Sequence, residues 1–283
     1  MQAWEILLPA FVLCALMIAT HTYFGLHVLA RGIIFVDLAL AQVAALGVSV
    51  AFLMGWDVHG FHAQLTALLF TLIAALMLAT LRDIPDKTAR EVIIGCVYVV
   101  ATATAIVILS RSSQGMEELK SLFSGNILWV RWEEVAFLAA VYSALALLHV
   151  IFFRRFKALS FDESEVRANA FKWELLFFVS FALVITLAVN LAGVLMVFAF
   201  LIIPAFAASL LMQSFFARLA LGSALAMTGS SAGLWLSFAG DLPTGPVIVA
   251  VLGGLPLVTG VALWLRRKLL VRRKADQQQH EGR

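Results

Sequence analysis

Charged residues are scarce in this sequence of 283 residues. Asp, Glu, Lys and Arg make up 13% of it and 63% of its residues are hydrophobic, whereas a soluble domain carries about 25% charged residues. A water-soluble globular fold is therefore excluded. Cysteine is also rare, because only Cys14 and Cys96 occur and both lie in apolar stretches. Two thiols so far apart indicate neither a disulfide framework nor a C-x-x-C metal or redox motif.

Three motifs of catalytic chemistry are missing as well. The sequence has no G-x-x-x-x-G-K-[ST] loop to hold the phosphates of ATP, no H-E-x-x-H zinc motif and no G-x-S-x-G nucleophile. No pairing of an acid with a base, or of a nucleophile with a base, emerges from the remaining polar residues. The sequence is typical of a conduit through a membrane, and a membrane enzyme is disfavoured.

Long uncharged runs are what the sequence has in abundance. A helix that spans a bilayer needs about 20 apolar residues, and runs of this kind cover residues 6–30, 38–56, 58–81, 92–110, 135–153, 175–217, 219–240 and 242–265. The run 175–217 is long enough for two spans, and Asn190–Gly193 is the natural place to divide it. We predict an all-α, polytopic integral membrane protein with about nine transmembrane helices. Residues 1–265 form one transmembrane domain and residues 266–283 a basic and polar tail.

The basic residues predict the orientation of the chain. With nine spans, the N-terminus outside and the C-terminus in the cytoplasm, all but three of the 20 Lys and Arg residues fall on the inner side. The exceptions are Arg111, Lys120 and Arg131. This asymmetry follows the positive-inside rule, and it predicts a multi-pass protein of the cell (inner) membrane. The basic residues are scattered over loops and the tail 266–274, where they meet anionic lipid, so we expect no nucleic-acid partner.

Two segments between the spans predict structure of their own. In Ser112–Glu134, apolar residues share one helical face and two tryptophans follow, which favours a helix resting on the outer membrane surface; these residues are Met116, Leu119, Leu122, Phe123, Trp129 and Trp132.

The second segment, Arg154–Glu174, lies on the inner side. Its Ser160 and Glu163 form a capping-box pattern, so we predict that a short helix begins at Ser160. Such an amphipathic helix is a natural docking element for a partner protein, through Ser160, Asp162, Glu163, Val166 and Phe171. A solvated loop helix is the alternative, because an [ST]-x-x-[DE] match is weak alone.

Asp37 is the only acidic residue within an apolar run. A charge at this depth costs about 3 kcal/mol on insertion scales, so we expect Asp37 to face a cavity or a partner and to serve transport. One alternative is a structural ion pair with Arg31. Another is a secondary transporter or channel that uses Asp37 as a proton or cation site. Gln42 lies about 140° around the helix from Asp37, so the two need not act together.

Histidines supply the other candidate ligands. Imidazole suits zinc and related ions, so His21 and His27 in the first span are candidates for the substrate pathway, and His149 ends the fifth span. Hydrogen bonding to a neighbouring helix is the alternative role for each. Outside the membrane, a seven-residue stretch gathers one carboxylate and two imidazoles that would suit a first contact with a cation: Asp57, His59 and His62. A polar turn is the alternative there.

Four stretches resemble motifs of one family, the permeases of ABC importers for zinc, manganese and ferrous iron. They are GLHVLAR (25–31) followed by DLALAQVAALGV (37–48), SLFSGNIL (121–128), VLMVFAFLIIPA (194–205) and DLPTGP (241–246). The resemblance covers roughly residues 5–265, and its strength lies in the order of the motifs together with the number of spans.

This resemblance implies a set of partners. It implies a second permease copy, two cytoplasmic ATPase subunits and an extracytoplasmic substrate-binding protein, with ATP hydrolysed on the other chains. It implies that residues 154–174 contain the coupling helix that docks on the ATPase. It also implies that a divalent metal ion is the cargo, with no cofactor held by this chain. An ABC permease for a metal chelate is the nearest alternative.

One departure from the family pattern concerns the cargo. The family has an Asp and, four residues later, a His; alignment on Leu46–Val48 puts Leu38 and Gln42 in those places, with Asp37 shifted by one. An amide is a poor zinc ligand compared with imidazole. Either Asp37 and a histidine of the first span rebuild a metal site, or the cargo is not a bare ion.

Overall fold

A computed structural model describes residues 3–58, 60–111, 114–125, 127–161 and 170–261. Within these ranges the chain forms helices and contains no strand. In chain order the helices are α1 (Ala3–Arg31), α2 (Val36–Leu53), α3 (Phe61–Thr80), η1 (Leu81–Asp83), α4 (Lys87–Leu109), α5 (Gly115–Ser124), η2 (Ile127–Trp129), α6 (Trp132–Ile151), α7 (Phe153–Phe161), α8 (Ala170–Ala192), α9 (Val194–Leu211), α10 (Phe215–Gly240) and a last helix, Thr244–Val261.

The predicted spans are confirmed. In the described part of the chain, nine helices are long and apolar enough to cross a membrane. The long run divides as predicted, because α8 ends at Ala192 and α9 begins at Val194. Gly193 between them has a φ of 77°, a conformation that glycine adopts at little cost.

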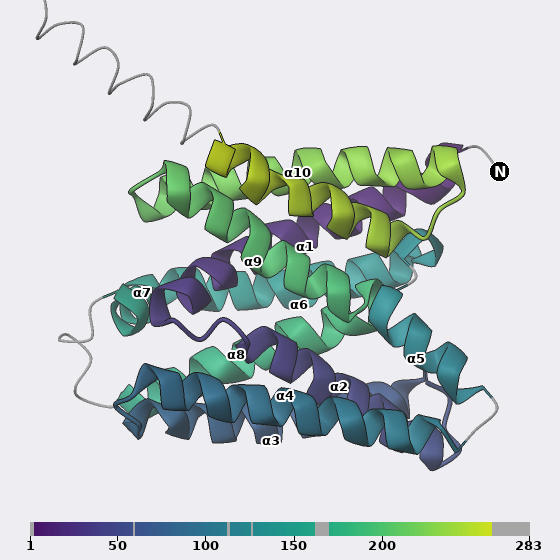
Figure 1. The fold of residues 1–283 in the computed structure, drawn as a ribbon, viewed down its shortest axis with the longest axis horizontal. Helices are drawn as coiled ribbons and strands as arrows, with labels where there is room; N and C mark the ends of the chain where they lie inside the picture. The colour runs from purple at the N-terminus through teal and green to yellow at the C-terminus, as the bar shows by residue number, and fades with distance from the viewer. Residues whose placement is uncertain (1–2, 59, 112–113, 126, 162–169, 262–283) are drawn as a thin grey trace, which may run out of the picture.

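The helices form two groups joined by a central layer (Figure 1). On one side α2 packs against α3 and α4, and on the other α1 packs against α9 and α10. Helix α8 contacts α2 and α3 and also α9. The core is rich in aromatic rings from α1, α8 and α9, such as Phe24, Phe181 and Phe200, which are fully buried.

Small residues allow the closest helix contacts. A Cβ atom at Gly25 of α1 would clash with the carbonyl oxygen of Leu201 in α9, and one at Gly47 of α2 would clash with the backbone of Ala67 in α3. Close backbone approach of this kind increases van der Waals contact between membrane helices. The glycines of the first motif therefore pack helices within one chain.

Three of the four motif stretches meet at the end of the molecule that carries α5. A Cβ at Gly125 would clash with the carbonyl oxygen of Ala192, one at Gly193 with the amide nitrogen of Gly125, and one at Gly245 with the carbonyl oxygen of Ser124. These glycines belong to, or directly precede, the motifs at 121–128, 194–205 and 241–246. The motifs are thus parts of one packed junction.

The segment after α4 contains the helix predicted there. Helix α5 packs against α4, α8 and α9, and Leu122 contacts a small buried cluster that includes Ala44 and Ala67. Trp129 and Trp132 are 75% and 50% exposed. Helix α5 thus packs against other helices of the chain. Its contact with a membrane surface stays a prediction.

The predicted helix start at Ser160 is wrong. Ser160 lies in the last turn of α7, which begins at Phe153, so it cannot be the first cap of a helix that starts there. Its hydroxyl forms hydrogen bonds with His27 and Arg31 of α1 instead of capping a helix. Asp162, Glu163 and Val166 lie outside the described residues.

Candidate functional site

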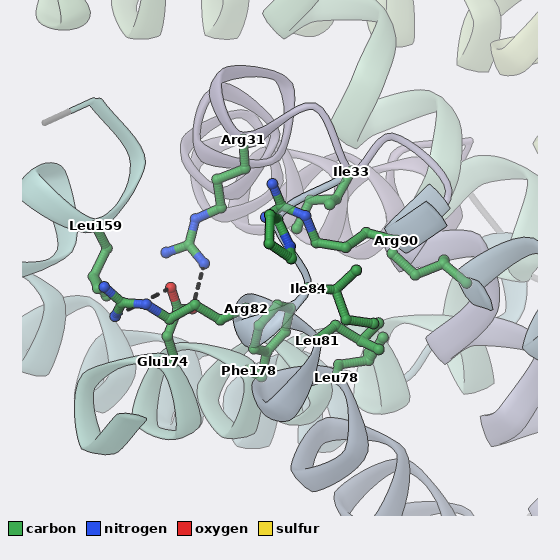
Figure 2. Close-up of a pocket in the computed structure, with 12 residues that line it drawn as sticks. Arg31, Ile33, Leu78, Leu81, Arg82, Ile84, Arg90, Leu159, Glu174 and Phe178 are labelled. Carbon is green, nitrogen blue, oxygen red and sulfur yellow. Dashed lines mark hydrogen bonds and ion pairs between the residues drawn. The ribbon is translucent and has the colours of Figure 1, made fainter. Parts of the chain in front are cut away.

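A buried ion pair closes the end of the molecule opposite α5. Arg31, the last residue of α1, places its Nη1 2.6 Å from Oε2 of Glu174 in α8, and both side chains are only 8% exposed. Arg82 of η1 approaches the other oxygen of Glu174 at 4.0 Å. Figure 2 shows Arg31 and Arg82 meeting Glu174. A carboxylate buried in this way is stable only because it is paired.

Arg31 is held by two further contacts. Its Nε donates to the hydroxyl of Ser160 at 2.8 Å, and its guanidinium lies 4.0 Å from the centre of the Phe177 ring. A cation over an aromatic face is stabilised by the charge distribution of the ring. The guanidinium is therefore fixed by α7 and α8 together.

The same hydroxyl connects Arg31 to His27. Nδ1 of His27 lies 2.7 Å from the Ser160 oxygen, and His27 precedes Arg31 by one helical turn, so both side chains leave α1 on one face. Nε2 of His27 is buried and has no hydrogen-bond partner in the described part of the chain. His27, Ser160, Arg31 and Glu174 thus form a continuous polar cluster from three helices.

Asp37 and Gln42 lie on α2 and are buried. Asp37 occupies the first turn, where the positive end of the helix dipole favours a negative charge. Neither of its carboxylate oxygens has a hydrogen-bond partner among the described residues. The alternative of an ion pair between Asp37 and Arg31 is wrong, because Arg31 pairs with Glu174.

The remaining intramembrane histidines have different surroundings. His21 is fully buried, with Nδ1 2.8 Å from the carbonyl oxygen of Met17, and its Nε2 has no hydrogen-bond partner within the described ranges. His149 bonds the Tyr23 hydroxyl at 3.0 Å and the Ser180 hydroxyl at 2.8 Å. His149 therefore links α6 to α1 and α8, as the alternative interpretation expects.

The described residues contain no group of three or more His, Cys, Asp or Glu side chains placed to hold a metal ion. The candidates for the substrate pathway on α1 and α2 are all buried: His21, His27, Asp37 and Gln42. The two histidines and Asp37 do not come together as a metal site.

The outer cluster is only partly described. Asp57 and His62 are exposed, and the His62 ring lies 5.0 Å from that of Trp56. His59 lies outside the described residues, so this cluster stays a prediction. Phe171, a candidate for docking, is 46% exposed in the first turn of α8.

The model of one protein family matches nearly the whole chain. The model of the ABC 3 transport family matches residues 3–262. The chain belongs to the ABC 3 transport family. This confirms the resemblance seen in the four motifs, and it makes the chain a multi-pass permease subunit of an ABC transporter.

Relatives of this ABC 3 family chain carry transport names. It is 25% identical to the "Probable metal transport system membrane protein" of Chlamydia trachomatis, over 81% of this chain and 80% of that protein. It is 26% identical to the "Manganese transport system membrane protein MntC" of Listeria innocua, over 80% of each. It is 22% identical to the "Chelated iron transport system membrane protein YfeC" of Yersinia pestis, over 88% of this chain and 83% of that one.

Two solved structures share the fold of the ABC 3 family chain. "PsaBC from Streptococcus pneumoniae in complex with Fab" aligns with a TM-score of 0.74 at 24% identity, covering 91% of this chain and 92% of that one. "An inward-facing conformation of a putative metal-chelate type ABC transporter" aligns with a TM-score of 0.70 at 18% identity, covering 90% and 85%. At these identities the similarity concerns the fold.

The charged end of this permease was missed by the sequence patterns. Glu174 directly precedes the apolar run 175–217 and looks like the end of a loop, yet it lies inside the spanning helix α8 and is buried. Asp37 is therefore not the only acid within a span. The spacing of Glu174, Phe177, Phe178 and Phe181 puts all four on one helical face, which is the signal that Glu174 points inward.

Proposed function

We propose that this chain is the permease subunit of an importer for a transition-metal ion, either zinc, manganese or iron. The ion is the substrate. A separate cytoplasmic ATPase hydrolyses ATP, an extracytoplasmic binding protein delivers the ion, and a second permease copy completes the pathway.

The family match over residues 3–262 carries this proposal. The relatives from Listeria innocua and Yersinia pestis are named for the transport of manganese and of chelated iron, which supports a metal as cargo. The sequence itself adds support, because it contains no G-x-x-x-x-G-K-[ST] phosphate-binding loop. A transporter built on this chain would therefore take its ATPase from another chain.

Asp37 is the residue that we assign to the cargo. Its carboxylate is buried without a hydrogen-bond partner among the described residues, and carboxylate oxygen is a suitable ligand for divalent cations. Among the residues that the structure describes, His21 and His27 each have one ring nitrogen buried without a hydrogen-bond partner, so their imidazoles are available to a passing ion. Gln42 contributes an amide on the same helix as Asp37. Alternation between two packings of the helices would bring such groups into contact with the cargo in turn.

The start of α8 is the part that we assign to the ATPase. Phe171 is exposed at the end of the molecule that carries most of the basic residues among those described. Its neighbour three residues on, Glu174, is paired with Arg31 of α1. A force on this segment would therefore reach α1 through a rigid contact.

Uptake by proteoliposomes tests the proposal. Vesicles with the permease, its ATPase and its binding protein are loaded with ATP and supplied with radioactive manganese, zinc or iron, and we expect ATP-dependent uptake of at least one ion. Uptake without the ATPase, driven by an ion gradient, would contradict the proposal in favour of a secondary transporter. Uptake of chelated iron alone would favour the metal-chelate permease.

A further inference from the structure

A cavity of about 150 Å³ lies beside the buried ion pair and is lined by more cations than anions. Three guanidinium groups, of Arg31, Arg82 and Arg90, and one carboxylate, of Glu174, face it among the described residues. The arginines come from α1, η1 and α4, and Figure 2 shows their side chains around the same space. The lining therefore carries an excess of positive charge that Glu174 neutralises only in part.

Several donors at this cavity have no hydrogen-bond acceptor among the described residues. They are Nη2 of Arg31, Nε of Arg90 and Nη1 of Arg82, which is buried and comes no nearer to Glu174 than the 4.0 Å of their ion pair. Guanidinium nitrogens donate and cannot accept, and a buried donor without an acceptor loses the hydrogen bonds that water would supply. The cavity is thus built for an anion with several oxygens, and the planar fork of arginine matches phosphate well.

The surroundings favour a phosphate that carries an apolar chain. The cavity is closed on its other sides by apolar residues such as Leu78 and Ile94. An apolar groove runs along the outer face of α4, lined by Phe35, Val92, Val99 and Val100. Ile33 lines the cavity and Phe35 lines the groove, so only one residue of the turn between α1 and α2 lies between a residue of the charged part and a residue of the apolar part.

We propose that Arg31, Arg82 and Arg90 bind the phosphate of an anionic phospholipid, whose acyl chain lies in the groove along α4. The site is at the end of the spans where most of the described basic residues lie, which is where a negatively charged leaflet is expected. A lipid bound there would link the end of α1 and the η1 turn after α3 to α4. Its phosphate would supply negative charge to the three arginines, which Glu174 neutralises only in part. This assignment is independent of which ion the permease carries.

Lipid titration of the purified full-length chain tests the proposal. The protein is stripped of lipid in detergent, and binding of phosphatidylglycerol and phosphatidylcholine is measured by native mass spectrometry. We expect phosphatidylglycerol to bind about tenfold more tightly than phosphatidylcholine, and R82Q and R90Q each to weaken it about tenfold, because each removes charge-assisted hydrogen bonds. R90K, which keeps the charge, should weaken it less.

Arg155→Gln is the matched control, since Arg155 is exposed in α7 and does not line the cavity. It should bind phosphatidylglycerol as the wild type does, and all variants should elute as folded protein in size-exclusion chromatography. Equal binding of the two lipids, or wild-type binding by both R82Q and R90Q, would overturn the proposal. Displacement of the lipid by inorganic phosphate at equal concentration would assign the cavity to a soluble phosphate and overturn the lipid assignment.

Discussion

Arg31 connects three helices through side-chain contacts. It pairs with Glu174 of α8, donates to Ser160 of α7 and lies over the ring of Phe177. Because the ion pair is buried, each partner depends on the other for its stability in the folded state.

Removal of one partner of this pair should therefore destabilise the protein strongly. We expect Glu174→Gln to lower the free energy of unfolding by about 3–5 kcal/mol, because it leaves the buried guanidinium of Arg31 without an ion-pair partner among the described residues. Titration with a denaturing detergent measures this. The double variant Arg31→Met/Glu174→Met should lose less free energy of unfolding than Arg31→Met and Glu174→Met lose in sum as single variants. Additive losses would contradict the coupling.

Asp37→Asn tests the residue assigned to the cargo. The amide keeps the size of the side chain but removes its negative charge, so we expect metal uptake in the reconstituted transporter to fall about tenfold or more. Ser49→Ala is the control, because Ser49 is buried on the same helix and its hydroxyl bonds only the carbonyl of Ala45. Wild-type uptake of manganese, zinc and iron by Asp37→Asn would remove Asp37 from the pathway.

At the scale of the helices, the junction between α8 and α9 depends on glycine. Gly193 combines a φ of 77° with direct backbone contact to Gly125 at the end of α5. Any side chain at this position meets both a conformational penalty and a clash.

We therefore expect Gly193→Ala to lower the free energy of unfolding by about 2 kcal/mol or more. Gly253→Ala in the last helix is the matched control, because a Cβ there would meet nothing within 4 Å. That change should be neutral or stabilising by about 0.5–1 kcal/mol. Similar unfolding curves for the two variants would show that the junction tolerates a side chain.

The segment from Glu163 to Phe171, which ends at the start of α8, carries the prediction on coupling. We expect Glu163→Ala and Phe171→Ala to weaken assembly with the ATPase and to lower transport-stimulated ATP hydrolysis, because an exposed aromatic side chain anchors a protein contact. Phe216→Ala is the control, since Phe216 is a similarly exposed ring, at 65%, at the start of α10. Unchanged assembly and ATP turnover in both test variants would exclude docking at this segment.

At the scale of the whole molecule, the two ends differ in charge. One end has α7, the Arg31–Glu174 pair and most of the basic residues among those described, and the other has α5 and the glycine junction. The positive-inside rule predicts that the basic end lies in the cytoplasm.

Cysteine labelling tests this orientation. In a variant whose Cys14 and Cys96 are replaced by alanine, a single cysteine at the exposed Arg131 should react with a membrane-impermeant maleimide in intact cells, and one at the exposed Arg155 only after lysis. The reverse pattern would invert the topology. Neither position lines the cavity beside Glu174.

The sequence by itself determined about nine spans, a break within Asn190–Gly193 and the resemblance to the family. These follow from local properties, because a helix satisfies its own backbone hydrogen bonds and the bilayer sets the length of each apolar run. The motifs were readable for the same reason, since each is a continuous stretch.

Only the tertiary structure decided the partners of the buried polar groups. Glu174 meets Arg31 across 143 residues and Ser160 meets it across 129, so no local pattern reveals either contact. The local pattern at Ser160 even predicted a helix cap, because a serine followed by an acid looks the same whether its hydroxyl caps a helix or bonds a distant arginine. Which side chains pair inside a membrane protein depends on how its helices pack, and that packing is a property of the whole chain.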